Sequence, residues 1–132
     1  MKALNPETLR APFAAYSHGT EIPCGMRLIR TSGQLGIEAD DSIPDSPFDQ
    51  AVICFGNIRA ILAEGGMTPE DVVHVTGYVT AREHMAGYMR ARDAFIGDAS
   101  RLPSSTLLIV SGFTKPEFKV EVEVWAAQAV AE

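Results

Sequence analysis

Residues 118–126 read Phe-Lys-Val-Glu-Val-Glu-Val-Trp-Ala, a strict alternation of apolar and polar side chains. Because successive side chains of a strand point to opposite faces of a sheet, this pattern predicts a strand. Its apolar face carries Phe118, Val120, Val122 and Val124. Glu121 and Glu123 lie on the other face, two positions apart and next to Trp125. That face is either a solvated sheet surface or the wall of a site.

The remaining chain divides into strands and helices. Strands are expected at residues 26–33 and 104–111, and at 71–80, which is rich in β-branched and aromatic side chains. Another is expected at 13–22, before the turn Pro23-Cys24-Gly25. The last strand is expected at 117–128. Helices are expected at 47–64 and 81–97, with a polar loop at 38–47 between the second strand and the first helix.

The first helix has clear signals at both ends. Ser46 is a good N-cap, Pro47 suits the first helical position, and Asp49 suits the positive end of the helix dipole. Gly65-Gly66 ends the helix. Apolar residues recur at helical spacing and predict its buried stripe as Phe48, Ala51, Val52, Phe55, Ile58 and Leu62.

The second helix is expected to begin with a capping box formed by Thr80 and Glu83. Its predicted core face comprises Met85, Tyr88, Met89 and Phe95.

The element order ββαβαββ in 132 residues favours one domain, spanning residues 1–132, with a two-layer α+β architecture. Two helices would cover one face of a mixed sheet. The continuous apolar run Leu107–Val110 suggests a strand buried on both faces. Because helices cover only one face, the second cover is expected to come from another subunit.

Composition excludes several classes of protein. A formal net charge of −6 and a pI near 5.0 disfavour nucleic acid as the main partner. The N-terminus lacks the apolar segment of a signal peptide, and no stretch suits a membrane span. Cys24 and Cys54 have no Cys-x-x-Cys spacing and are expected to be reduced, mostly buried thiols of a cytoplasmic protein. The histidines are scattered, so no metal site is expected; they are His18, His74 and His84.

Four short segments, taken together, resemble a known protein family, although no single segment is specific for it. They are Ala-Tyr-Ser-His at 15–18, Arg-Thr-Ser-Gly-Gln at 30–34, Pro-Ser-Ser-Thr-Leu at 103–107 and Val-Glu-Val-Glu-Val at 120–124. In this order and spacing the chain resembles the RidA/YjgF family of reactive-intermediate deaminases, from about residue 4 to residue 128. The resemblance implies a chorismate-mutase-like fold and a barrel-like homotrimer with three clefts between subunits. It also implies hydrolysis of enamines and imines such as 2-aminoacrylate without metal or cofactor.

The resemblance further implies roles for individual residues. By position, Glu121 matches a water-orienting glutamate, and Tyr16 and Gly33 match residues that line the cleft. Ser105 stands where deaminase members carry an arginine that clamps the substrate carboxylate, which places the chain in an arginine-less branch. Leu107 replaces a cysteine, although its backbone can still line the site.

Loss of the arginine leaves two main interpretations open. The first is a hydrolase of small enamines or imines that turns over 2-aminoacrylate weakly, with Ser105 helping to position the ligand. The second is a non-catalytic, small-molecule-binding or regulatory trimer. RNA cleavage, attributed to some family members, is disfavoured by the acidic chain. Should another arginine act as the clamp, Arg30 and Arg101 are the first candidates by proximity in sequence.

The two glutamates of the last strand are expected to differ. Glu121 should lie in the cleft, partly buried, with a raised pKa. Glu123 should be hydrogen-bonded or salt-bridged for structure.

Overall fold

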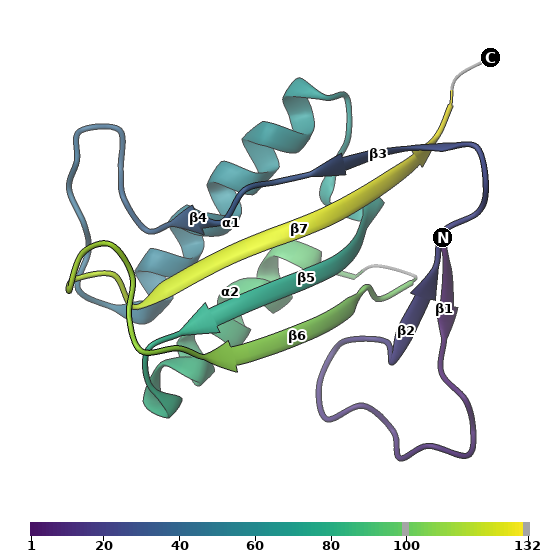
Figure 1. The fold of residues 1–132 in the computed structure, drawn as a ribbon, viewed down its shortest axis with the longest axis horizontal. Helices are drawn as coiled ribbons and strands as arrows, with labels where there is room; N and C mark the ends of the chain where they lie inside the picture. The colour runs from purple at the N-terminus through teal and green to yellow at the C-terminus, as the bar shows by residue number, and fades with distance from the viewer. Residues whose placement is uncertain (99–100, 131–132) are drawn as a thin grey trace.

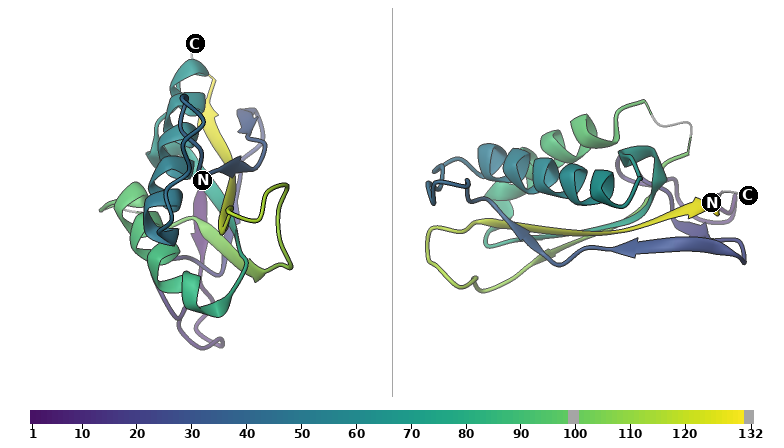
Figure 2. Two further views of the ribbon diagram at one scale, coloured as in Figure 1. Left: turned by 90° about the vertical axis from the view of Figure 1, so that its left-hand side faces the viewer. Right: turned by 90° about the horizontal axis from the view of Figure 1, so that it is seen from above.

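Two helices pack on one face of a mixed sheet in the computed structural model, which describes residues 1–98 and 101–130 (Figures 1 and 2). The helices are α1 (Pro47–Glu64) and α2 (Met85–Ile96). The strands are β3 (Met26–Arg30), β4 (Gln34–Leu35), β5 (Val72–Val79), β6 (Ser104–Ile109) and β7 (Val120–Ala129). The expected α+β fold is therefore confirmed, and the ends of the strands expected at 26–33, 71–80, 104–111 and 117–128 are displaced by at most three residues.

The sheet is organised around β7. Its order is β3-β7-β5-β6, with β4 also paired to β7, and among the described strands of this sheet only β5 and β6 pair in parallel. The predicted alternation holds, since Val120, Val122 and Val124 are fully buried in the core beneath the helices. Glu121 and Glu123 are partly exposed on the opposite face, which we call the open face because neither of the described α-helices covers it (Figure 2, right).

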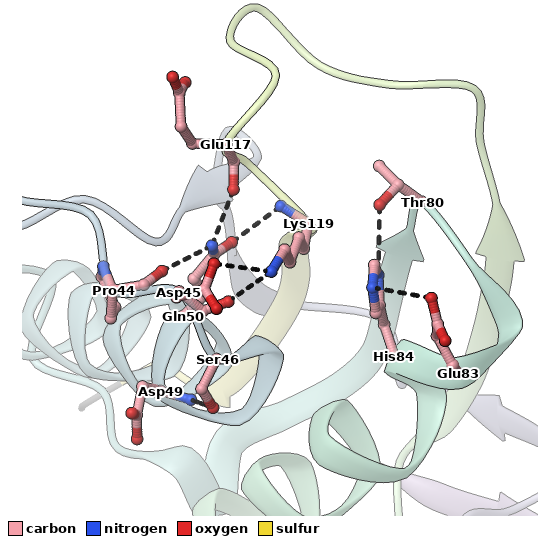
Figure 3. Close-up of polar contacts among 10 residues, drawn as sticks. All are labelled: Pro44, Asp45, Ser46, Asp49, Gln50, Thr80, Glu83, His84, Glu117 and Lys119. Carbon is pink, nitrogen blue, oxygen red and sulfur yellow. Dashed lines mark hydrogen bonds and ion pairs between the residues drawn. The ribbon is translucent and has the colours of Figure 1, made fainter.

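Helix α1 begins and ends where the sequence predicts. The Ser46 hydroxyl accepts a hydrogen bond from the Asp49 backbone N–H at 3.1 Å (Figure 3). The predicted buried stripe is wrong at one position, because Val52 is 47% exposed. Cys54 and Gln50 are buried instead, since they face β7 and the loop before the helix.

Gln50 is a buried polar residue whose amide is satisfied by three backbone groups (Figure 3). Its Nε2 donates to the carbonyls of Pro44 and Glu117 at 2.8 and 2.9 Å, and its Oε1 accepts from the Lys119 N–H at 2.8 Å. The side chain thereby ties the polar loop before α1 to the segment that enters β7. Helical periodicity cannot reveal this, because the partners are distant in sequence.

The expected capping box of the second helix is wrong. A 3₁₀ turn, η2 (Arg82–His84), precedes α2, which begins only at Met85. Thr80 Oγ1 lies 3.2 Å from His84 Nδ1, and Glu83 Oε1 lies 3.9 Å from His84 Nε2 (Figure 3). Both candidate capping side chains therefore contact the histidine ring rather than backbone N–H groups.

The expected strand at 13–22 is also wrong. Only Gly19–Glu21 forms a strand, β2, and it pairs with β1 (Lys2–Leu4) in a separate two-stranded sheet. The Tyr16 N–H donates to Ala14 O at 2.9 Å and the Ser17 N–H to Pro103 O at 2.9 Å. These bonds fold residues 13–17 into a turn against the start of β6, and extended pairing ends there.

Leu108 and Ile109 of β6 are each 47% exposed in a single chain, so the cover expected from another subunit stays a prediction. Exposure corrects one further expectation. Cys24 is exposed, whereas Cys54 is buried and burial raises its pKa to about 12. Across the described residues, no helix combines the length and apolarity required to cross a membrane.

Candidate functional site

The first group of site residues lies on the open face, where the Glu121 side chain packs over Gly33. A Cβ atom at position 33 would lie 2.8 Å from Glu121 Oε2, so only glycine permits this approach. Gly33 lies just before β4, which pairs with β7 beside Glu121. The structure therefore brings together two of the residues singled out from the sequence.

Glu121 carries the perturbed carboxyl group of this face. Burial raises its pKa, and the neighbouring Glu123 carboxylate raises it further. A carboxylate with a raised pKa is a better proton acceptor near neutral pH than an ordinary surface glutamate. The predicted partial burial and raised pKa of Glu121 are both confirmed.

Glu123 is held by its neighbours, as predicted. The Tyr78 hydroxyl donates a hydrogen bond to Glu123 Oε1, and Arg30 Nη2 lies 3.9 Å from Glu123 Oε2. The hydrogen bond to Glu123 is the main cause that raises the pKa of Tyr78. Tyr78 is paired directly with Glu121 across the strands, so this network also fixes the wall beside Glu121.

The open face continues with a second polar cluster on β5 and β6. His74 Nδ1 lies 2.6 Å from Ser104 Oγ, and His74 Nε2 lies 3.0 Å from Thr76 Oγ1. Burial lowers the pKa of His74. A neutral imidazole with both ring nitrogens occupied is a structural element of the sheet. Among the residues that the structure describes, no group of three or more His, Cys, Asp or Glu side chains could hold a metal ion.

The second group of site residues lies on the helix side of the sheet. Tyr16, Ser105 and Leu107 line a cavity of about 360 Å³ between α2, β6 and the turn at 13–16. The β6 register pairs Ser105 with Val75 and Leu107 with Gly77, both of which face the core, so these side chains point toward α2. Three of the residues expected at the site are thus brought together here.

Arg92 is a functional candidate that sequence reasoning missed. It is only 3% exposed, and its Nη1 donates to Ser105 Oγ at 3.3 Å within the cavity wall. Helical spacing could have found it, because Arg92 follows the buried Tyr88 by four residues and precedes the buried Phe95 by three.

The arginines proposed from proximity in sequence lie elsewhere. Arg30 lies on the open face, 61% exposed, with its guanidinium 5.3 Å from the centre of the Trp125 ring. Arg101 is exposed and donates to the Met1 carbonyl oxygen.

The two groups of site residues are separated by the sheet itself. Gly33 and Glu121 lie on the open face, whereas Tyr16, Ser105 and Leu107 lie on the helix side. One chain therefore does not place the Glu121 carboxylate in the helix-side cavity.

Comparison with known proteins agrees with this fold. Among curated proteins, the chain is 28% identical over 121 residues to the RutC family protein YjgH of Escherichia coli K12, covering 91% of each chain. It is also 28% identical over 125 residues to a RutC family protein of Aquifex aeolicus, covering 94% of this chain and 95% of that protein.

Solved structures of similar proteins have the same fold as this chain. YyfB of Yersinia pestis, a protein of the conserved Rid family, superposes with a TM-score of 0.85 at 25% identity, covering 96% of this chain and 98% of that one. The YjgF gene product of E. coli gives a TM-score of 0.71 at 24% identity, covering 97% and 99%. The family model described as Endoribonuclease L-PSP matches residues 8–128. This chain therefore belongs to the Endoribonuclease L-PSP family, which includes the RidA/YjgF proteins that its sequence resembles.

Proposed function

We propose that this protein is a metal-free hydrolase that adds water to a small imine or enamine and releases ammonia. The observation that carries this proposal is the Glu121 carboxylate, which lies over Gly33 with a pKa raised by burial and by Glu123. A partly desolvated carboxylate beside a residue without a side chain, here Gly33, can act as a general base that orients one water molecule. The likeness of the chain to the RidA/YjgF reactive-intermediate deaminases supports the same class of reaction.

The chemistry requires one proton acceptor and a site that positions the C=N carbon. An enamine first tautomerises to the imine. Glu121 accepts a proton from water as the oxygen bonds to the imine carbon, and then passes it to the nitrogen, which gives a carbinolamine and restores the carboxylate. Glu121 next transfers the hydroxyl proton to the nitrogen as the C–N bond breaks and a C=O bond forms, so that imine and water yield a carbonyl compound and ammonia.

A second copy of the chain completes this site in our proposal. The ligand-positioning groups Tyr16, Ser105 and Leu107 lie across the sheet from Gly33 and Glu121. The open face and the β6 edge also expose large apolar side chains, among them Leu28 at 51%, Leu108 at 47% and Trp125 at 39%. A barrel-like homotrimer would cover this surface and bring the β6 edge of one subunit next to Glu121 of its neighbour.

The test is imine hydrolysis measured in the presence of a trap. An amino-acid oxidase generates imines from a panel of amino acids, and semicarbazide captures whatever has not been hydrolysed. The parent protein should lower the trapped fraction for at least one imine, and Glu121→Gln should not. If the parent accelerates hydrolysis of no imine in the panel, the hydrolase proposal is wrong.

The replacement of the expected arginine by Ser105 favours a second candidate, a non-catalytic trimer that binds a small metabolite at the same cleft. This alternative predicts saturable ligand binding without turnover by the parent protein. RNA cleavage, which the family description names, is the weaker candidate, because a formal net charge of −6 opposes binding of a phosphate backbone.

A further inference from the structure

The helix-side cavity combines a buried cation with apolar walls. Apolar side chains form most of its lining, contributed by Phe13, Met85, Met89 and Leu107. The polar groups are the hydroxyls of Tyr16 and Ser105 and the guanidinium of Arg92. Such a small set of polar groups in an apolar cavity is typical of sites that orient a small ligand.

The positive charge of the buried Arg92 guanidinium is only partly balanced by its neighbours. Its Nε and Nη2 donate to Asp93 Oδ1 at 3.2 and 3.0 Å, and its Nη1 donates to Ser105 Oγ at 3.3 Å. The Asp93 side chain is 50% exposed, so solvent screens its charge, and a serine hydroxyl carries none. The guanidinium also has more N–H donors than these contacts use.

A structural role for this ion pair alone would be the simpler explanation, but the geometry argues for more. Asp93 is half exposed, so its screened charge does not offset the desolvation cost of burying the Arg92 guanidinium. An anion bound inside the cavity could offset that cost. One turn earlier on α2, the Tyr88 hydroxyl is fully buried and has no hydrogen-bond partner within the described residues. Arg92 and Tyr88 therefore both have hydrogen-bonding groups that are free to bind a ligand.

We propose that Arg92 binds the carboxylate of a small ligand whose apolar or aromatic body fills the cavity. This inference rests on the proposed function, and it names the substrate class as imines of 2-oxo acids with apolar side chains. A guanidinium binds a carboxylate through two parallel hydrogen bonds, and a single cation suits a monoanion. The small side chain of Ser105 leaves room for this group to enter from α2. Tyr16 would supply a further hydroxyl at the carboxylate or at the reacting carbon.

Direct binding of phenylacetate and of the neutral, nearly isosteric phenylacetamide tests this assignment by calorimetry. The parent should bind phenylacetate at least about tenfold more tightly than phenylacetamide. Arg92→Met should remove that preference while leaving phenylacetamide binding unchanged. Arg90→Met is the matched control, since Arg90 is an exposed arginine of the same helix, and it should change either Kd by no more than about twofold.

A second variant decides the matter if Arg92→Met does not fold. Met89→Glu places a carboxylate on the cavity wall from a partly exposed position, so it should abolish phenylacetate binding by competing for Arg92. Undiminished phenylacetate binding by Met89→Glu or by Arg92→Met would overturn the inference, as would equal binding of acid and amide by the parent.

The same titrations separate this inference from the proposed reaction. Glu121→Gln should still bind phenylacetate, because Arg92 and not Glu121 holds the ligand carboxylate, while it loses imine hydrolysis. Arg92-dependent binding without hydrolysis by the parent would refute the reaction alone, and hydrolysis that is insensitive to Arg92 would refute the carboxylate site alone.

Discussion

The carboxyl group of Glu121 occupies the space that a side chain on Gly33 would need. A Cβ atom added to Gly33 would lie 2.6 Å from Glu121 Cδ, closer than unbonded carbon atoms approach. The glycine thus fixes where the carboxylate lies, although the two residues are far apart in sequence.

Gly33→Ala should displace the Glu121 carboxylate without unfolding the protein, because the end of a flexible side chain can move. We expect kcat/KM for imine hydrolysis to fall by at least about tenfold, with the melting temperature nearly unchanged. Gly112→Ala is the control, since no atom lies within 4 Å of an added Cβ there. Unchanged turnover by Gly33→Ala would show that imine hydrolysis does not depend on the position of the Glu121 carboxylate.

The two glutamates of β7 should respond differently to the same substitution. Glu121→Gln should abolish turnover while leaving assembly intact and without lowering the melting temperature. Glu123→Gln should cost about 1 kcal/mol of stability, because it weakens the contacts with Tyr78 and Arg30, with a smaller effect on turnover. Parallel thermal melts and kinetic assays of both variants check this. Normal turnover by Glu121→Gln would show that the open face is only a structural wall.

The raised pKa of Glu121 predicts how stability depends on pH. The folded protein holds this proton more tightly than the unfolded chain, so the charged form costs stability at pH values above the folded pKa. That cost disappears as pH falls below the unfolded pKa. Glu121→Gln should therefore exceed the parent in unfolding free energy at about pH 8 and lose the advantage at about pH 4. Urea denaturation at both values measures the difference, and an advantage that grows toward low pH would contradict it.

Gln50 should be among the most sensitive positions of the core. Gln50→Leu leaves the Pro44 and Glu117 carbonyls and the Lys119 N–H without their partner, and should cost about 2–4 kcal/mol. Val52→Ala on the exposed side of the same helix should change the free energy of unfolding by less than about 0.5 kcal/mol. Equal effects of the two substitutions in denaturant titrations would refute this ranking.

Assembly as a homotrimer is the remaining prediction. Light scattering in dilute solution should give a mass about three times that of the 14.2 kDa chain. The exposed apolar side chains of the open face supply the physical reason, because association removes them from water. A monomer at assay concentrations would exclude a site built from two subunits.

By itself, the sequence determined the features that depend on neighbouring residues. The alternation at 118–126 predicts β7 and the faces of Glu121 and Glu123, because strand geometry repeats every two residues. Ser46, Pro47 and Gly65 predict both ends of α1, because caps act within one turn.

Only the tertiary structure decided the contacts between distant segments. The approach of Gly33 to Glu121, the bond from Arg92 to Ser105 and the bridges made by Gln50 follow from strand order and helix packing. These depend on which faces meet when the core packs, so local periodicity does not encode them. For the same reason, only the fold revealed that the candidate site residues lie on two opposite faces of one sheet.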